Sequence, residues 1–180
     1  MEHTVEMNRA RSWLLVLAGG LVAGTFDISY ACAFWALKAN VPMQRIFQSV
    51  AKGLLGPAAY QGGAATAAIG LFLHFFIATS MAFAYYLVAQ RWTALRTYPL
   101  RYGAAYGLLL YGIMNYIVVP LSAARGGGSG GALWITLSIV VHMFLIGVPI
   151  AVIVSGCERR SIVSEPPWCA SSATVKESDV

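Results

Sequence analysis

Four long apolar stretches constrain this chain more than any other feature of its sequence. Each can cross the hydrocarbon core of a bilayer, which takes about 20 residues of α-helix. Of the 180 residues, 58% are hydrophobic and only 11% are charged, so the chain lacks the polar residues that cover a soluble domain of this size. The stretches are residues 13–37, 64–90, 103–123 and 132–156. We therefore predict an all-α membrane protein whose four transmembrane helices form an up-down bundle.

The rest of the chain divides around this transmembrane domain, residues 13–156. Residues 1–12 are a short N-terminal segment. Residues 157–180 are rich in Ser, Pro and charge, and we predict a disordered tail there.

The positive charges predict an orientation. If both termini are cytoplasmic, eight of the 12 Lys and Arg residues lie on the cytoplasmic side and four lie outside. The positive-inside rule therefore favours this arrangement. Anchoring beside the bilayer accounts for the net charge of +5, so we expect no nucleic-acid partner. The expected partners are the lipid bilayer and a second copy or another membrane protein.

An amphipathic helix is predicted at about residues 42–55, between the first two apolar stretches. Its apolar residues recur with helical spacing, whereas Gln48 falls among the polar residues of the other face. Pro42 suits the first helical turn and Gly56 the end. Two roles are open: an anchor in the outer membrane interface, which we favour, or a lid over the bundle.

Each apolar stretch contains one strongly polar side chain. At about 1.5 Å per residue, all four lie roughly 12–15 Å below the outer membrane boundary. Polar groups at such depth are costly, so they usually face the protein interior and mark a functional site. They are Asp27, His74, Asn115 and His142.

Small residues accompany these polar groups and favour an inward direction. Glycines let helices approach closely inside a membrane, so we predict that they mark the packed faces within the chain or between chains. The glycines in question are Gly20, Gly24, Gly70, Gly103, Gly107 and Gly112. Pro120 and Pro149 lie inside predicted spans and are expected to kink them.

A weak internal repeat predicts how the four polar residues pair. Gly24 precedes Asp27 by three residues, as Gly112 precedes Asn115. His74 and His142 are each followed two residues later by Phe, so the two halves of the chain resemble a parallel repeat. In a bundle with short loops, Asp27 would then lie near His74, and Asn115 near His142.

Three roles for these residues are open. The first, which we favour, is structural: interhelical hydrogen bonds, worth about 0.6–2 kcal/mol each, in a structural or partner-binding protein. The second is a proton or solute pathway, since Asp and His are typical relay groups. The third is a haem or divalent metal held by His74 and His142. No loop resembles a nucleophile–base triad, so we predict no enzyme.

Five short motifs occur between about residues 20 and 125: Gly24-Thr25-Phe26-Asp27, the segments 48–56 and 62–67, Leu73-His74-Phe75, and the segment 114–122. Together they resemble a group of small four-helix bacterial inner-membrane proteins that have no assigned activity. The resemblance implies a location in the bacterial inner membrane and a four-helix topology only.

Overall fold

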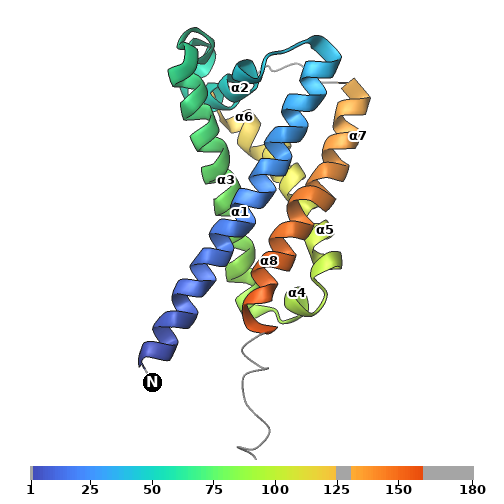
Figure 1. The fold of residues 1–180 in the computed structure, drawn as a ribbon. Helices are drawn as coiled ribbons and strands as arrows, with labels where there is room; N and C mark the ends of the chain where they lie inside the picture. Colours follow the sequence, from blue (N-terminus) through green and yellow to red (C-terminus); the bar gives the residue numbers. More distant parts are fainter. Residues whose placement is uncertain (1, 125–130, 160–180) are drawn as a thin grey trace, which may run out of the picture.

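A computed structural model of the chain describes residues 2–124 and 131–159 (Figure 1). All the regular elements in these two ranges are helical, and no strand occurs there. Four helical segments of the described chain are long and apolar enough to cross a membrane: Arg11–Ala39, Gly63–Arg91, Pro99–Leu121 and Gly131–Gly156. This confirms the all-helical class and agrees with a multi-pass membrane protein. Most of the tail predicted to be disordered, residues 160–180, lies outside the described residues.

The first two spans are single helices, and the last two are composite. The elements in chain order are α1 (Glu2–Ala39), α2 (Met43–Leu55), η1 (Gly56–Gln61), α3 (Gly63–Arg91), α4 (Ala94–Thr97), α5 (Pro99–Ile113), η2 (Met114–Val118), α6 (Val119–Leu121), α7 (Gly131–Val141), η3 (His142–Gly147) and α8 (Val148–Arg159). The connection through α2 lies at one end of the bundle and α4 lies at the other (Figure 1). We refer to these as the α2 end and the α4 end.

A π-helical turn interrupts each of the last two spans just before a proline. The turn η2 ends two residues before Pro120, and η3 ends two residues before Pro149. Proline has no N–H, and its ring crowds the carbonyl four residues earlier, which in each case belongs to the π turn. The wider turn gives that carbonyl room. Both turns contain one of the four polar residues, Asn115 in η2 and His142 in η3.

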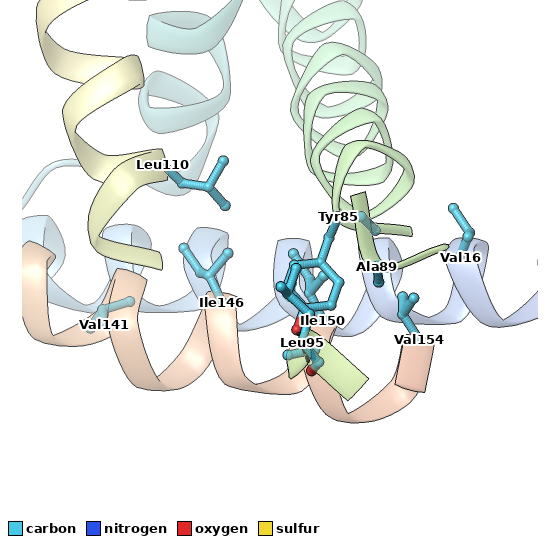
Figure 2. Close-up of a cluster of buried hydrophobic side chains, with 12 residues drawn as sticks. Val16, Tyr85, Ala89, Leu95, Leu110, Val141, Ile146, Ile150 and Val154 are labelled. Carbon is cyan, nitrogen blue, oxygen red and sulfur yellow. Dashed lines mark hydrogen bonds between the residues drawn. The ribbon is translucent and has the colours of Figure 1, made fainter. Parts of the chain in front are cut away.

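A cluster of buried apolar side chains closes the bundle from the α4 end towards its middle (Figure 2). Tyr85 of α3 lies inside this cluster, and its hydroxyl donates a hydrogen bond to the Leu95 carbonyl of α4 at 3.0 Å. The labelled members of the cluster are Val16, Tyr85, Ala89, Leu95, Leu110, Val141, Ile146, Ile150 and Val154. The only hydroxyl among these labelled residues is therefore satisfied, and the cluster fills this part of the bundle with apolar side chains.

Glycines bring α5 into direct contact with the fourth span. A Cβ atom on Gly103 would lie 2.8 Å from the Ala151 Cβ and 2.9 Å from the Gly147 carbonyl oxygen. A Cβ atom on Gly107 would overlap the His142 carbonyl. These two helices therefore pack backbone against backbone, which only glycine permits.

Candidate functional site: a polar cavity in the bundle

The four polar residues all line one cavity in the half of the bundle nearest α2. Its volume is about 230 Å³, and each of the four spans contributes one of the residues, Asp27, His74, Asn115 and His142. Other lining side chains are Tyr30 of α1, Val50 of α2, and Trp134 and Ser138 of α7. The structure thus brings the four predicted polar residues together in the lining of one cavity.

His74 connects the second span to the first. Its Nε2 lies 2.8 Å from the carbonyl oxygen of Gly24. The approach depends on Gly24, since a Cβ there would lie only 2.9 Å from the Phe75 ring. A carbonyl oxygen can only accept, so Nε2 carries the proton of this bond. In a neutral imidazole the other nitrogen, Nδ1, is then a free acceptor.

His142 is held in the opposite tautomer by its own helix. Its Nδ1 lies 2.8 Å from the Ser138 carbonyl oxygen, one turn earlier, and therefore donates to it. The Tyr111 ring lies edge-on to the imidazole, with ring centroids 5.4 Å apart. The Nε2 nitrogen of a neutral His142 is therefore the acceptor.

Asp27 is half-buried at the cavity wall. Within the described chain, no hydrogen bond or ion pair reaches its carboxylate, and no Lys or Arg side chain lines the cavity. One helical turn further, the Tyr30 hydroxyl lies 3.5 Å from the Ser138 Oγ, and the Tyr30 ring stacks on Trp134 with centroids 5.2 Å apart. The carboxylate is therefore available to a ligand, beside an aromatic pair.

Asn115 differs from the other three because it is exposed. Its Nδ2 donates to the Tyr111 carbonyl of its own helix at 2.9 Å. A Cβ atom on Gly112 would meet nothing within 4 Å, so this glycine, unlike Gly103 and Gly107, supports no close approach in the described structure. The exposure of Asn115 places it at an edge of the cavity rather than within the wall.

The predicted Asx–His pairs are not hydrogen-bonded to each other. Both histidines bond to backbone carbonyls, and Asn115 does the same. Among the four residues, only His74 forms a hydrogen bond to another helix in the described chain. The four polar residues therefore line a cavity, and hydrogen bonds between helices are not their main role.

Helix α2 covers one end of the cavity, and its Val50 side chain contributes to the cavity lining. Gln48, predicted on the polar face, is only 2% exposed because α2 folds back against α3. Its Nε2 donates to the Gly63 carbonyl at 3.0 Å and lies 3.3 Å from the Thr66 Oγ1. On the other side, the Gly53 carbonyl accepts from the Ala123 N–H at 3.0 Å. The helix thus bridges the second and third spans.

Gly70 makes the packing of α2 on α3 possible. A Cβ atom on Gly70 would overlap the Phe47 carbonyl of α2. The Gly20–Gly24 face of α1 packs on α3 in the same manner, since a Cβ on Gly20 would lie 2.5 Å from the Thr79 Cα. Both contacts hold α3 beside the cavity.

The cavity can hold water or one small polar head. At about 30 Å³ per water, 230 Å³ corresponds to about eight water molecules. It is smaller than the roughly 300–1,000 Å³ of pockets that hold drug-sized ligands. The described residues contain no group of three or more His, Cys, Asp and Glu side chains that could hold a metal ion.

Tyr30, Trp134 and Ser138 were not singled out from the sequence. Two of them carry a signal in their spacing, since Tyr30 lies three residues after Asp27 and Ser138 lies four residues before His142. Both therefore share a helix face with a polar residue. Trp134 has no such signal, because only the tertiary structure places it on Tyr30.

No protein-family model matches the chain, and no curated protein or solved structure matches it either.

Proposed function

We propose that this protein is a small carrier of the bacterial inner membrane that binds protons or small cations in its polar cavity and exchanges them across the bilayer. The observation that supports this most is the convergence of one polar side chain from each span on one cavity. A carboxylate without a protein partner inside a membrane span needs a proton or a cation, because an uncompensated charge there is costly.

The free atoms of the cavity favour a positively charged or hydrogen-donating ligand. Asp27 offers carboxylate oxygens, and His74 and His142 each offer one acceptor nitrogen. With no Lys or Arg in the lining, the ionised carboxylate gives the cavity a negative charge. A purely structural role has less support, because only one of the four residues bonds to another helix.

The proposed topology has four crossings in alternating directions, with both termini in the cytoplasm. Arg91, Arg96 and Arg101 then lie beside α4 on the cytoplasmic side, as the positive-inside rule favours. The cavity lies in the outer half of the membrane under α2, which takes the part of a lid. The apolar cluster of Figure 2 separates it from the cytoplasm.

The test is proton flux in vesicles that contain the purified protein and a trapped pH-sensitive dye. We expect faster flux under an imposed potential than in protein-free vesicles. Asp27→Asn should reduce the flux to the protein-free level, because the amide cannot bind a proton at this position. Thr25→Val is the control, since the Thr25 hydroxyl is exposed and bonds only the Leu21 carbonyl of its own helix. Wild-type flux equal to that of empty vesicles would refute the proposal.

A further inference from the structure

The opening of the cavity can be located from the exposure of its lining. Of the residues that line it, only Asn115 and Val119 are exposed, and all the others are half-buried or buried. Both belong to the third span, on η2 and α6. The cavity therefore opens beside η2 and α6.

The other sides of the cavity are closed by packed elements. Gly24 and His74 join α1 to α3, and the Tyr30–Trp134 stack joins α1 to α7. The Gly107–His142 contact joins α5 to η3. Helix α2 covers one end, and the apolar cluster seals the other.

A gap in this wall remains beside the η2–α6 segment of the third span. Near the α4 end, α3 meets α5 where the Tyr106 hydroxyl donates to the Met81 carbonyl at 2.7 Å. Towards the α2 end, neither α3 nor α7 packs closely on η2 or α6 within the described structure. The exposed Asn115 and Val119 border this gap, and both lie inside the apolar span Pro99–Leu121. The opening therefore faces the bilayer and not the water.

The interior chemistry indicates what could enter by that route. The unpartnered groups are the carboxylate of Asp27 and the acceptor nitrogens of His74 and His142. The stacked rings of Tyr30 and Trp134 line the same space. A carboxylate beside aromatic rings is the environment that stabilises organic ammonium groups, by charge attraction and by cation–π contact. The volume admits a head group, whereas an attached apolar chain would extend through the gap into lipid.

We propose that the cavity binds the cationic head of a lipophilic amine or quaternary ammonium compound, which enters from the bilayer through the gap beside the η2–α6 segment. This rests on the proposed cation-binding function and names the substrate class and the route. Asp27 compensates the charge of the head, the stacked Tyr30 and Trp134 form one side of its site, and Asn115 lies at the entrance.

The experiment measures binding of octyltrimethylammonium to the full-length protein in lipid nanodiscs by isothermal titration calorimetry. We expect saturable one-site binding, no comparable binding of the uncharged isostere 2,2-dimethyldecane, and much weaker binding of tetramethylammonium, which has the head without the chain. Asp27→Asn should abolish binding, and Asp27→Glu should retain it. Because the three compounds are compared on the wild-type protein, the test does not depend on the folding of any variant.

The route is tested by narrowing the gap. Asn115→Trp should slow octyltrimethylammonium binding, whereas Tyr116→Trp should not, because Tyr116 is equally part of η2 and exposed but does not line the cavity. Equal rates in these two variants would overturn the route. Equal binding of the uncharged isostere, or no octyltrimethylammonium binding, would overturn the substrate class. If Asp27-dependent proton flux persists in that case, the proposed function stands without this inference, and loss of both would remove the proposed function as well.

Discussion

The smallest residues of this protein determine where its polar ones lie. Gly24 lets α3 approach α1 closely enough for His74 to bond the Gly24 carbonyl. Gly107 packs against the backbone of His142, which lies in the first position of η3. Both histidines then donate one ring N–H to a carbonyl and leave one nitrogen free. The acceptor character of the cavity therefore follows from backbone packing as much as from the side chains themselves.

The Gly107→Ala substitution tests this packing. The added methyl group would overlap the His142 carbonyl, so the helices must separate, and we expect a loss of about 1–3 kcal/mol in the free energy of unfolding. The measurement is unfolding of the purified protein by SDS in mixed micelles. Gly112→Ala is the matched control, because nothing lies within 4 Å of its added Cβ. Equal losses in the two variants would contradict the role assigned to Gly107.

At the scale of elements, helix α2 is held in part by hydrogen bonds of Gln48, a residue that the sequence pattern places on the solvent-exposed polar face. The helical spacing of apolar residues predicts the helix near residues 42–55, and the structure has it at Met43–Leu55. The pattern assumes one buried face, but α2 lies against α3, and Gln48 is buried there between Gly63 and Thr66. The spacing of apolar residues in one helix cannot predict this burial, because it carries no information about the polar groups of the neighbouring helix.

Removing these contacts should loosen α2. In Gln48→Leu, two hydrogen bonds of about 0.5–1.5 kcal/mol each are lost, so we expect faster amide hydrogen exchange throughout α2. The rest of the bundle should exchange as in the wild type. Gln44→Leu serves for comparison, since Gln44 is exposed on the same helix. Unchanged exchange in Gln48→Leu would show that apolar packing alone holds α2.

At the scale of the whole molecule, the bundle has two dissimilar ends. One end is filled by the cluster around Tyr85 and Ile150, and the other contains the polar cavity under α2. This difference gives the proposed membrane orientation a functional meaning, because the cavity would be closer to the outside and the seal to the cytoplasm. The positive charges beside α4 favour that orientation.

Cysteine labelling tests the orientation. Both Gln61, beyond α2, and Thr93, beside α4, are exposed, so each accepts a single cysteine in a variant whose native cysteines are replaced by serine. A membrane-impermeant maleimide should label Gln61→Cys in intact cells and Thr93→Cys only after the inner membrane is disrupted. The reverse pattern would mean that the cavity faces the cytoplasm.

Parts of the site could be predicted from single helices, and parts could not. Asp27, His74, Asn115 and His142 are recognisable in the sequence because a polar side chain inside an apolar span is rare and costly. No hydrogen bond joins the two residues of either expected pair, since backbone carbonyls satisfy His74, His142 and Asn115 instead. The π turns were also not predicted, although Pro120 and Pro149 signalled a local disturbance.

The sequence by itself determined the helical class and the four apolar spans, each with one polar residue, because length and hydropathy act within each segment. Only the tertiary structure decided that these residues surround a cavity, that Tyr30 and Trp134 stack in its wall, and that neither α3 nor α7 packs closely on η2 and α6. These features depend on how closely each pair of helices approaches. Glycines determine this approach for each pair of helices. Neighbouring helices are in close contact at Gly24 and Gly107, whereas nothing lies close to Gly112.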